Sequence, residues 1–392
     1  MKLGLVSRVE SEFNCSLFLT KKKTPEGAPP KYRIVQNLKG LNSVTKPSNF
    51  RLNRIDECLD RIALKGSKIF SSVDLRHGYY NLEIEPKDRK KTAFWCEGLG
   101  QLAWNVAAQG LVNCPATFSR VIHRVFRKQI EKFEIENYLD DLLCHAKTHA
   151  DMLRILEEVF ESLRKAGLEL NLEKCTWGAS SLVYLGFKID KNGYTASPDN
   201  VRTITNAREP ISTRMVRSYI GLLNFYFHTI PNYSQLIKPL TSLISKNSTW
   251  HGGKLPLQAK LAYEKVKKIM SNPPFIHHPN FNWKFHLYTD GSLGQMGTNS
   301  GGISGCLVQY EDDKMTNHPR CLGFASRSLR GAEKAYSSFL IENLALSYSI
   351  DFFSKYLVGR HFYCYVDHRP MCNLNNTQKR TLLRLRTQCG LL

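Results

Sequence analysis

Tyr138-Leu139-Asp140-Asp141 is the stretch on which the fold of this chain depends. It lies between two apolar, β-prone segments, residues 133–137 and 142–144, and this pattern predicts a tight hairpin. Two adjacent carboxylates without a basic neighbour repel each other and raise each other's pKa. Mg²⁺ binds carboxylate oxygens together with substrate phosphates, so the hairpin tip is a candidate divalent-cation site. The alternative is an ordinary polar turn, because aspartate is common in turns for purely local reasons.

A third acid stands upstream, where residues 69–73 are predicted to form a short strand that ends at Asp74. Phosphoryl transfer requires the attacking and leaving oxygens to be held in line and their charge to be neutralised. Two divalent ions bound by carboxylates from different elements can do this. Asp74 and the two hairpin aspartates would form such a site if their strands are neighbours in one sheet. The sequence leaves this adjacency open.

The charge of the chain predicts a polyanionic partner. The 392 residues, enough for two to three domains, include 55 Lys+Arg against 34 Asp+Glu, which gives a net charge of +21 and a pI of about 9.5. Such an excess is typical of proteins that bind nucleic acid. The net charge is +7 over residues 1–200 and +14 over residues 201–392, so the second half is expected to bind more strongly.

The eleven cysteines include no Cys-x-x-Cys pair. They therefore indicate a reducing compartment and argue against a disulfide framework or a zinc knuckle. No signal peptide and no apolar run of transmembrane length is visible. We therefore expect an intracellular protein without membrane attachment, in the cytoplasm or, as the second option, in the nucleus.

Hydrophobic periodicity predicts the order of the elements. The clearest helix is residues 151–166, with apolar residues at i, i+3, i+4, i+7, i+8 and i+11 and with Gly167 as its stop. Residues 3–6 are expected to be the end of a helix, and residues 246–254 a linker. Strands are expected at 17–20, 32–38, 81–85, 168–172, 285–289, 302–310, 320–326 and 362–366, a hairpin at 184–193, and helices from about 115 to 132, 198 to 227, 261 to 270 and 336 to 356.

Five motifs occur in the order found in reverse transcriptases. They are Val73-Asp74 with Tyr79, Gln109-Gly110 before Pro115-Ala116-Thr117-Phe118, Tyr138-Leu139-Asp140-Asp141, Leu170-Asn171-Leu172-Glu173-Lys174-Cys175, and Leu185-Gly186-Phe187. The chain most resembles gypsy-like LTR retrotransposons and retroviral pol proteins. The resemblance implies an α+β right-hand polymerase with fingers, a palm built on an antiparallel sheet and a helical thumb. An α/β ribonuclease H-like domain, truncated at its C-terminus, would follow.

The resemblance also implies domain boundaries. Fingers and palm would span residues 1–183, with a clipped N-terminus, and the thumb residues 184–250. A connection would span residues 251–283, and an incomplete ribonuclease H-like domain residues 284–392.

The same resemblance assigns the polymerase acids. Asp74 and Asp140 would hold two Mg²⁺ ions, or Mn²⁺ in their place, and Asp141 would support that site. Tyr79 would lie under the sugar of the incoming nucleotide and clash with a 2′-hydroxyl, the group that distinguishes ribonucleotides. For Tyr79 the alternative is an ordinary half-buried aromatic residue.

Further positions would contact the nucleotide and the primer. Arg33 would bind the triphosphate, because its guanidinium matches phosphate oxygens. Gln109, followed by Gly110, would contact the nucleotide from the other side. Lys174 would be a general acid toward pyrophosphate, although a solvent-facing lysine is an equal alternative. Leu185, Gly186 and Phe187 would hold the primer end, with the glycine allowing close backbone approach. The basic loop at residues 21–27 would close on the triphosphate or be a solvated loop.

A second set of acids, Asp290, Glu342 and Asp367, resembles the ribonuclease H site of these elements. It implies two-metal hydrolysis of the RNA strand in an RNA–DNA hybrid. Three unconnected surface acids are the alternative. The chain departs from the family at Ala108, where proline is usual, and at Leu340, where a second acid is frequent. It ends before the family's fourth carboxylate, so we expect an impaired domain with weak or no cleavage.

The leading hypothesis is an RNA-directed DNA polymerase acting on an RNA template, a DNA primer, RNA–DNA hybrids and deoxynucleoside triphosphates. A non-catalytic nucleic-acid-binding remnant of a transposable element is the main alternative. An RNA-dependent RNA polymerase is a third reading, and Tyr79 argues against it. The oligomeric state stays open.

Overall fold

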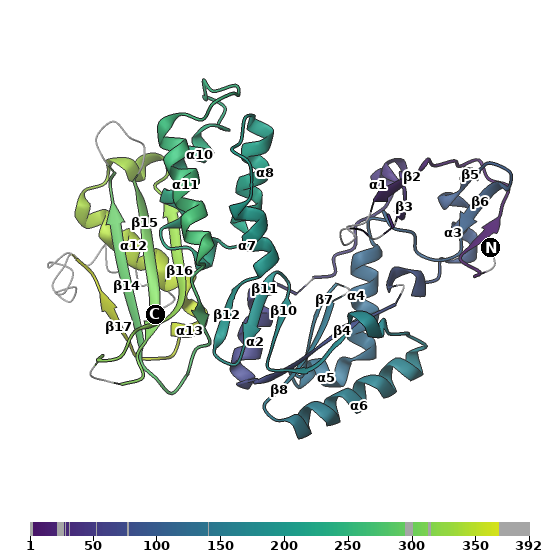
Figure 1. The fold of residues 1–392 in the computed structure, drawn as a ribbon, viewed down its shortest axis with the longest axis horizontal. Coiled ribbons are helices and arrows are strands. Elements are labelled where there is room, and N and C mark those ends of the chain that lie inside the picture. The colour runs from purple at the N-terminus through teal and green to yellow at the C-terminus, as the bar shows by residue number, and fades with distance from the viewer. Residues whose placement is uncertain are drawn as a thin grey trace. The chain divides into compact units, whose positions relative to one another are not determined.

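The computed structural model describes residues 3–21, 27, 29–30, 32–51, 53–76, 78–139, 141–294, 301–312 and 315–367. The chain forms two compact units, Met1–Leu185 and Gly186–Leu392 (Figure 1). Of the sequence-predicted positions, Asp140 and Lys22 to Glu26 lie outside the described residues.

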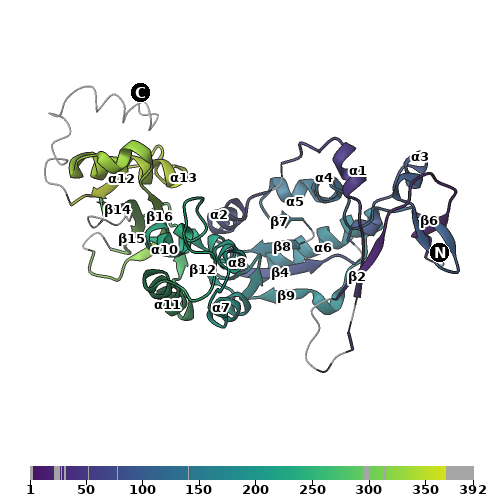
Figure 2. The same cartoon turned by 90° about the horizontal axis from the view of Figure 1, so that it is seen from above.

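The central sheet of the first unit is antiparallel with the strand order β7-β8-β4-β9. Its strands are β4 (Ile69–Asp74), β7 (Ile135–Tyr138), β8 (Asp141–Ala146) and β9 (Thr176–Ala179), which Figure 2 shows side by side. Strand β7 pairs with β8 through Tyr138 opposite Asp141, so the predicted hairpin is confirmed. The predicted strand ending at Asp74 is also confirmed.

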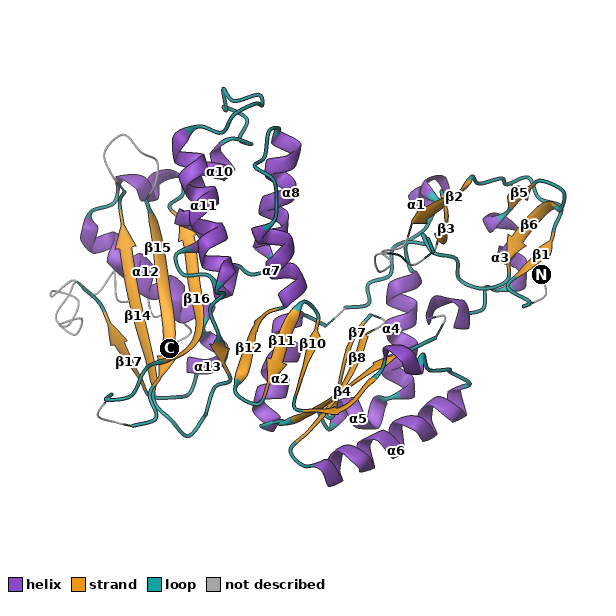
Figure 3. Cartoon of the chain, viewed as in Figure 1, coloured by secondary structure: helices purple, strands orange, loops and turns teal. Residues whose placement is uncertain are grey.

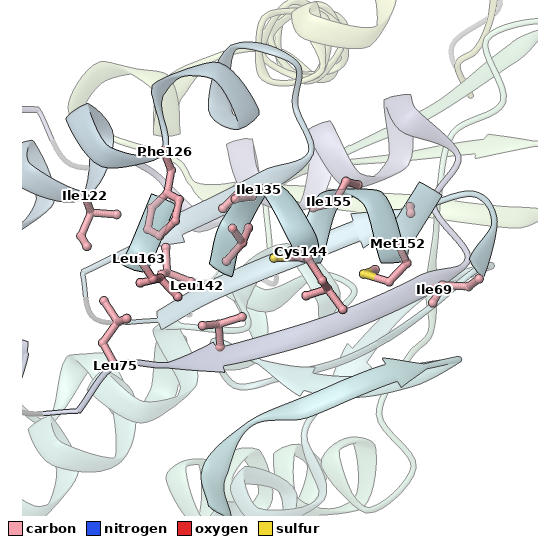
Figure 4. Close-up of a cluster of buried hydrophobic side chains, with 14 of the residues drawn as sticks. Ile69, Leu75, Ile122, Phe126, Ile135, Leu142, Cys144, Met152, Ile155 and Leu163 are labelled. Atoms are coloured by element: carbon pink, nitrogen blue, oxygen red, sulfur yellow. The ribbon is translucent and has the colours of Figure 1, made fainter. Parts of the chain in front are cut away.

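Two helices cover one face of this sheet, α4 (Cys114–Val125) and α6 (His149–Ala166). Side chains alternate along a strand, so Ile69 and Val73 of β4 point to the same face as Leu142 and Cys144 of β8. They form one buried cluster with the apolar sides of both helices (Figure 4). Asp74 and Asp141 follow the other alternation and therefore lie on the opposite face.

Local signals explain where the helices begin and end. The Thr148 side chain accepts a hydrogen bond from Asp151 N at the start of α6, and Gly167 ends it with φ of 66°. The predicted helix 151–166 is confirmed. The helix predicted to run to about Lys132 is divided at Phe126 into α4 and α5 (Arg127–Glu131).

The N-terminal part of the unit contains two smaller sheets. A hairpin pairs β2 (Leu17–Lys21) with β3 (Tyr32–Gln36), as predicted. The second sheet has the order β1-β6-β5, and its strands are β1 (Val6–Arg8), β5 (Phe94–Cys96) and β6 (Gly100–Trp104). The remaining elements of the unit are α1 (Lys39–Val44), α2 (Ile55–Lys65), α3 (Pro86–Arg89), β10 (Ser181–Tyr184) and short 3₁₀ turns at Gly78–Asn81, Lys90–Thr92 and Leu172–Lys174.

Three short predictions are wrong. The predicted helix end at residues 3–6 instead leads into β1, whose first residue is Val6 and which pairs with β6. The predicted strands at 81–85 and 168–172 each reduce to an isolated bridge, Glu83 to Val106 and Leu170 to Leu75. Such short segments carry too few residues for local propensity to outweigh tertiary contacts.

The second unit begins with β11 (Phe187–Asp190) and β12 (Gly193–Ala196), which confirm the predicted hairpin, and β12 also pairs with β13 (Ile276–His277). Helices follow. They are α7 (Pro198–Thr205), α8 (Thr213–Asn224), α9 (Tyr233–Leu236), α10 (Lys238–Ser242) and α11 (Leu257–Ser271), with a 3₁₀ turn at Phe227–Thr229. The helix predicted over residues 198–227 is divided into α7 and α8, and α9 and α10 were not predicted, whereas α11 confirms the helix predicted over residues 261–270.

The last sheet has the order β16-β15-β14-β17, and only the pair β14 and β17 is parallel. Its strands are β14 (Phe285–Ser292), β15 (Gly302–Gln309), β16 (Arg320–Ser328) and β17 (Phe362–Tyr365), close to the predicted ranges. A 3₁₀ turn at Gly331–Ala335 precedes helix α12 (Ser338–Phe352), which packs on one face of this sheet (Figure 3). Helix α13 (Ser354–Leu357) follows α12. Across the described residues, every helix is too short or too polar to span a membrane.

Candidate active site

Asp74 and Asp141 face each other across the pair β4–β8. The amide of Asp74 donates to Sγ of Cys175 at 3.4 Å, and its carbonyl accepts from Asn171 N at 2.9 Å. Both backbone groups of Asp74 are thus directed away from β8. In an antiparallel ladder, a pair of this kind has the closer side chains, so the two carboxylates are held near each other.

The electrostatics of this pair favour a bound cation. Burial, followed by the negative charge of Asp74, raises the pKa of Asp141, while Lys174 lowers it. Nζ of Lys174 lies 3.6 Å from Oδ2 of Asp74 and is the basic group of the pair's immediate surroundings. Two carboxylate oxygen donors on neighbouring strands fit the hard-cation preference of Mg²⁺. Among the described residues, which exclude Asp140, no group of three or more His, Cys, Asp or Glu is close enough to hold a metal ion.

A cavity of about 800 Å³ opens beside Asp74. It is lined by Tyr32 to Ile34, Asp74 to Arg76, Gly78 to Tyr80, Gln109, and Leu170 to Lys174. The structure therefore brings together five residues that the sequence motifs single out, namely Arg33, Asp74, Tyr79, Gln109 and Lys174. Asp74 and Tyr79 belong to one motif and the other three come from distant parts of the sequence, yet each of the five lies on or next to a different element.

Tyr79 has a defined orientation in this cavity. It lies in the 3₁₀ turn Gly78–Asn81, and its ring contacts Phe118 of α4 edge to face, with centroids 5.5 Å apart and planes at 84°. Phe118 is fully buried in the core under the sheet. The tyrosine ring thus packs against a rigid, buried side chain.

The loop at Gln109 is held from the N-terminal side. Asn42 donates from Nδ2 to the Gly110 carbonyl at 2.8 Å and accepts from Val112 N at 3.0 Å. Gly110 has φ of 113°, and a Cβ there would meet the Gln36 carbonyl at 3.1 Å, so glycine is required. Asn42 and the cavity residues Arg76 and Tyr80 have no assigned role in the sequence motifs. In the sequence, these three residues are marked only by their proximity to motif residues.

The predicted primer-holding residues lie at the boundary of the two units. Leu185 ends the first unit with φ of 47°, and Gly186 begins the second. A Cβ on Gly186 would come within 2.9 Å of Asn200 Nδ2. The Gly186 carbonyl accepts a hydrogen bond from the Tyr226 hydroxyl at 2.8 Å. Phe187 is buried and stacks on Phe225. Their part in primer binding stays a prediction.

The second set of acids is only partly gathered. Tyr288 of β14 is in register with Tyr365 of the parallel strand β17, and Asp290 and Asp367 each follow two residues later at the same edge. A Cβ on Gly291 would lie 2.7 Å from the side chain of Ile341, so α12 approaches β14 closely beside Glu342.

The three acids are not equally accessible. Glu342 is buried whereas Asp290 is exposed. Alternation puts Asp290 on the face opposite to α12, because Phe285 and Leu287 point to the α12 side. This is consistent with the absence of a three-residue metal cluster among the described residues.

Comparisons with known proteins cover most of the chain. Residues 20–189 match the family model described as reverse transcriptase (RNA-dependent DNA polymerase). Residues 257–364 match that of the RNase H-like domain found in reverse transcriptase. The retrovirus-related Pol polyprotein from transposon 297 of Drosophila melanogaster is 30% identical over 376 residues, which cover 96% of this chain and 34% of that protein. The transposon Tf2-3 polyprotein of Schizosaccharomyces pombe is 28% identical over 374 residues, or 95% of this chain and 26% of that protein.

The chain therefore spans between about a quarter and a third of the length of these relatives. Among solved structures, the foamy viral protease-reverse transcriptase dRH in complex with double-stranded DNA superposes with a TM-score of 0.81 at 22% identity, over 100% of this chain and 65% of that one. The foamy viral protease-reverse transcriptase in complex with RNA/DNA hybrid gives 0.72 at 20% identity, over 100% and 50%. These likenesses show the fold.

Proposed function

The chain belongs to the reverse transcriptase family, as the reverse transcriptase and ribonuclease H region of an LTR-retrotransposon Pol protein, and on that premise we propose that it is an RNA-directed DNA polymerase. It would extend a DNA primer on an RNA template with deoxynucleoside triphosphates. The observation that carries this proposal is the cavity in which Arg33, Asp74, Tyr79, Gln109 and Lys174 meet. A non-catalytic remnant is not favoured, because a remnant has no need to keep these residues around one cavity.

The carboxylates would hold the divalent cations. Asp74, Asp141 and the neighbouring Asp140 supply hard oxygen donors, and bound Mg²⁺ or Mn²⁺ would neutralise the charge of the transferred phosphoryl group. The proximity of Asp74 and Asp141, and the raised pKa that burial and Asp74 give Asp141, support a cation there.

The other cavity residues would orient the nucleotide. Arg33 has a planar guanidinium that suits triphosphate oxygens, and Gln109 and Gly110 would contact the nucleotide opposite to it. Lys174, 66% exposed and 3.6 Å from Asp74, would deliver a proton to the leaving pyrophosphate. The Tyr79 ring, braced by Phe118, would exclude a 2′-hydroxyl.

The nucleic acid would be held largely by charge, because the chain carries +21. Leu185, Gly186 and Phe187 would support the primer end. The complexes of the foamy viral enzymes with double-stranded DNA and with RNA/DNA hybrid support partners of this class. The cysteines of the described residues are all free, which supports a reducing intracellular compartment.

Primer extension tests the polymerase proposal. The full chain is incubated with a DNA primer on an RNA template, Mg²⁺ and deoxynucleoside triphosphates, beside Asp140→Asn and Asp74→Asn. We expect extension by the unaltered chain and none by either variant, with hybrid binding nearly unchanged in both. Extension by Asp140→Asn would exclude the metal role of that residue. Lack of extension by the pure, folded, unaltered chain would support the remnant instead.

The match of residues 257–364 favours a second, weaker activity, cleavage of the RNA strand of a hybrid by a site with Asp290, Glu342 and Asp367. The shared edge of β14 and β17 supports this proposal. Because Asp290 lies on the face of β14 opposite to α12, which carries Glu342, we expect slow cleavage. The measurement is release of fragments from a labelled RNA–DNA hybrid, and robust cleavage would refute the expectation of an impaired site.

A further inference from the structure

Residues 169–175 hold the backbone around Asp74 through a series of hydrogen bonds. Arg76 N donates to the Glu169 carbonyl at 2.7 Å, and Asn171 N donates to the Asp74 carbonyl at 2.9 Å. The third contact is the one from Asp74 N to Sγ of Cys175 at 3.4 Å. Asp74 is the last residue of β4, so these contacts replace the ladder that a neighbouring strand would otherwise supply.

The Cys175 thiol closes this set of contacts. A thiol has one weak donor and a weak acceptor. Its sulfur accepts from Asp74 N and lies 3.3 Å from the Asn171 carbonyl, to which it donates, whereas the Asp74 carbonyl is farther at 3.9 Å. Asp74, Asn171 and Cys175 therefore form a ring of three hydrogen bonds, and the thiol takes part in two of them.

Cys175 also holds the end of the loop that carries Lys174. Cys175 directly follows the 3₁₀ turn Leu172–Lys174, and its amide donates to the Leu172 carbonyl at 3.2 Å. Residues 171 to 174 line the cavity together with Asp74. The thiol thus links the main chain of the acid to the loop whose lysine reaches its carboxylate.

We propose that Cys175 is a positioning residue of the polymerase site, whose thiol holds the main chain of Asp74 where its carboxylate can bind a divalent cation. The inference rests on the proposed function. Cys175 is not among the cavity-lining residues, so it acts through Asp74 and not on the substrate. Loss of a partner that holds a metal ligand in place typically lowers metal affinity or activity by about 10- to 100-fold.

Metal binding and kinetics on the full chain test this role. The probe is Mn²⁺ alone, with the free ion measured by electron paramagnetic resonance, and Asp74→Asn defines the binding that occurs elsewhere on the chain. Cys175→Ala removes both hydrogen bonds, whereas Cys175→Ser keeps a group that can donate and accept. Cys15→Ala is the matched control, a partly buried free cysteine of the same unit.

For Cys175→Ala we expect the Mn²⁺ affinity and kcat to fall on the order of tenfold, with KM for deoxynucleoside triphosphate within about twofold. The melting temperature should stay close to that of the unaltered chain. Cys175→Ser should bind Mn²⁺ roughly two- to threefold more weakly than the unaltered chain, because the shorter C–O bond weakens one of the hydrogen bonds. Cys15→Ala should change neither the Mn²⁺ affinity nor kcat.

Equal Mn²⁺ affinity in Cys175→Ala and the unaltered chain would overturn the proposal, as would a rise in nucleotide KM with unchanged kcat. Should Cys175→Ala fail to fold, Cys175→Ser decides, and Mn²⁺ affinity equal to that of the unaltered chain would then refute it. Failure of the two proposals is distinguishable. An unaltered chain that binds Mn²⁺ at Asp74 but extends no primer contradicts the polymerase, while the comparison of Mn²⁺ affinities still tests Cys175.

Discussion

Replacement of Arg61 by methionine should strongly destabilise the first unit. Arg61 of α2 contacts the Glu136 carboxylate of β7 through Nε at 2.8 and 3.0 Å and Nη2 at 2.6 Å. The Glu136 side chain is only 1% exposed, whereas that of Arg61 is 21% exposed. Nε2 of His145 lies 3.8 Å from the same carboxylate, which is too long for a hydrogen bond. Without Arg61, a buried negative charge would lose its main partner.

The cost follows from this asymmetry. Removing one partner of a buried ion pair costs about 3–5 kcal/mol, whereas replacing both by apolar groups is often nearly neutral. We expect Arg61→Met to lower the free energy of unfolding by about 3 kcal/mol, at the low end because Arg61 is partly solvated. The double variant Arg61→Met/Glu136→Leu should lose less than Arg61→Met alone. Strand β7 leads directly into the aspartate hairpin, so primer extension should fall as well.

Urea unfolding followed by circular dichroism measures these values, and the four chains form a double-mutant cycle. Arg164→Met is the matched control, because its 2.8 Å ion pair with Glu161 is exposed and should contribute less than about 1 kcal/mol.

The ion pair between Arg61 and Glu136 also predicts a pH dependence of stability. Burial, the largest influence, raises the pKa of Glu136, but the interactions with His145 and Arg61 outweigh it and the pKa is lowered. The stability from Glu136 is therefore present above its ordinary value of 4.5 and lost as the pH falls below it. The difference in free energy of unfolding between Arg61→Met and the unaltered chain should therefore become smaller as the pH falls. A loss below 1 kcal/mol at neutral pH, or a double variant less stable than Arg61→Met, would refute the reasoning.

Three further predictions concern the site. Tyr79→Ala should admit ribonucleotides in primer extension, because it removes the ring that Phe118 supports, and unchanged sugar selectivity would exclude a steric gate. Mg²⁺ should raise the melting temperature of the unaltered chain and do so much less in Asp74→Asn. Burial and the charge of Asp74 raise the pKa of Asp141, so stability is lost as the pH rises through that pKa, and the effect of the cation should grow in the same pH range. A shift equal in both chains would place the stabilising ion elsewhere. Hybrid affinity should fall steeply between 50 and 200 mM salt, since Lys and Arg contacts release condensed counterions, and a flat response in a filter-binding titration would contradict binding through the +21 charge.

Local pattern was sufficient for the long and strongly periodic elements. The i, i+3, i+4 spacing and Gly167 located α6 to within two residues, because an amphipathic helix is encoded by near neighbours. The wrong strand at residues 168–172 shows the limit of such reasoning. Its apolar alternation suits a strand, yet only Leu170 forms a bridge, and the segment turns at Leu172 to hold Asp74 instead.

The sequence by itself determined which residues are the candidates for the chemistry, namely the acids at a strand end and a hairpin tip and the tyrosine five residues after Asp74. It also determined the family to which the order of these motifs belongs. Only the tertiary structure decided that Asp74 and Asp141 are partners on adjacent strands, and that Cys175 supports the first of them. The physical reason is that propensity and periodicity act over a few residues. The adjacency of β4, β8 and the segment 169–175 depends on burying one common core, whose contacts join positions up to about a hundred residues apart.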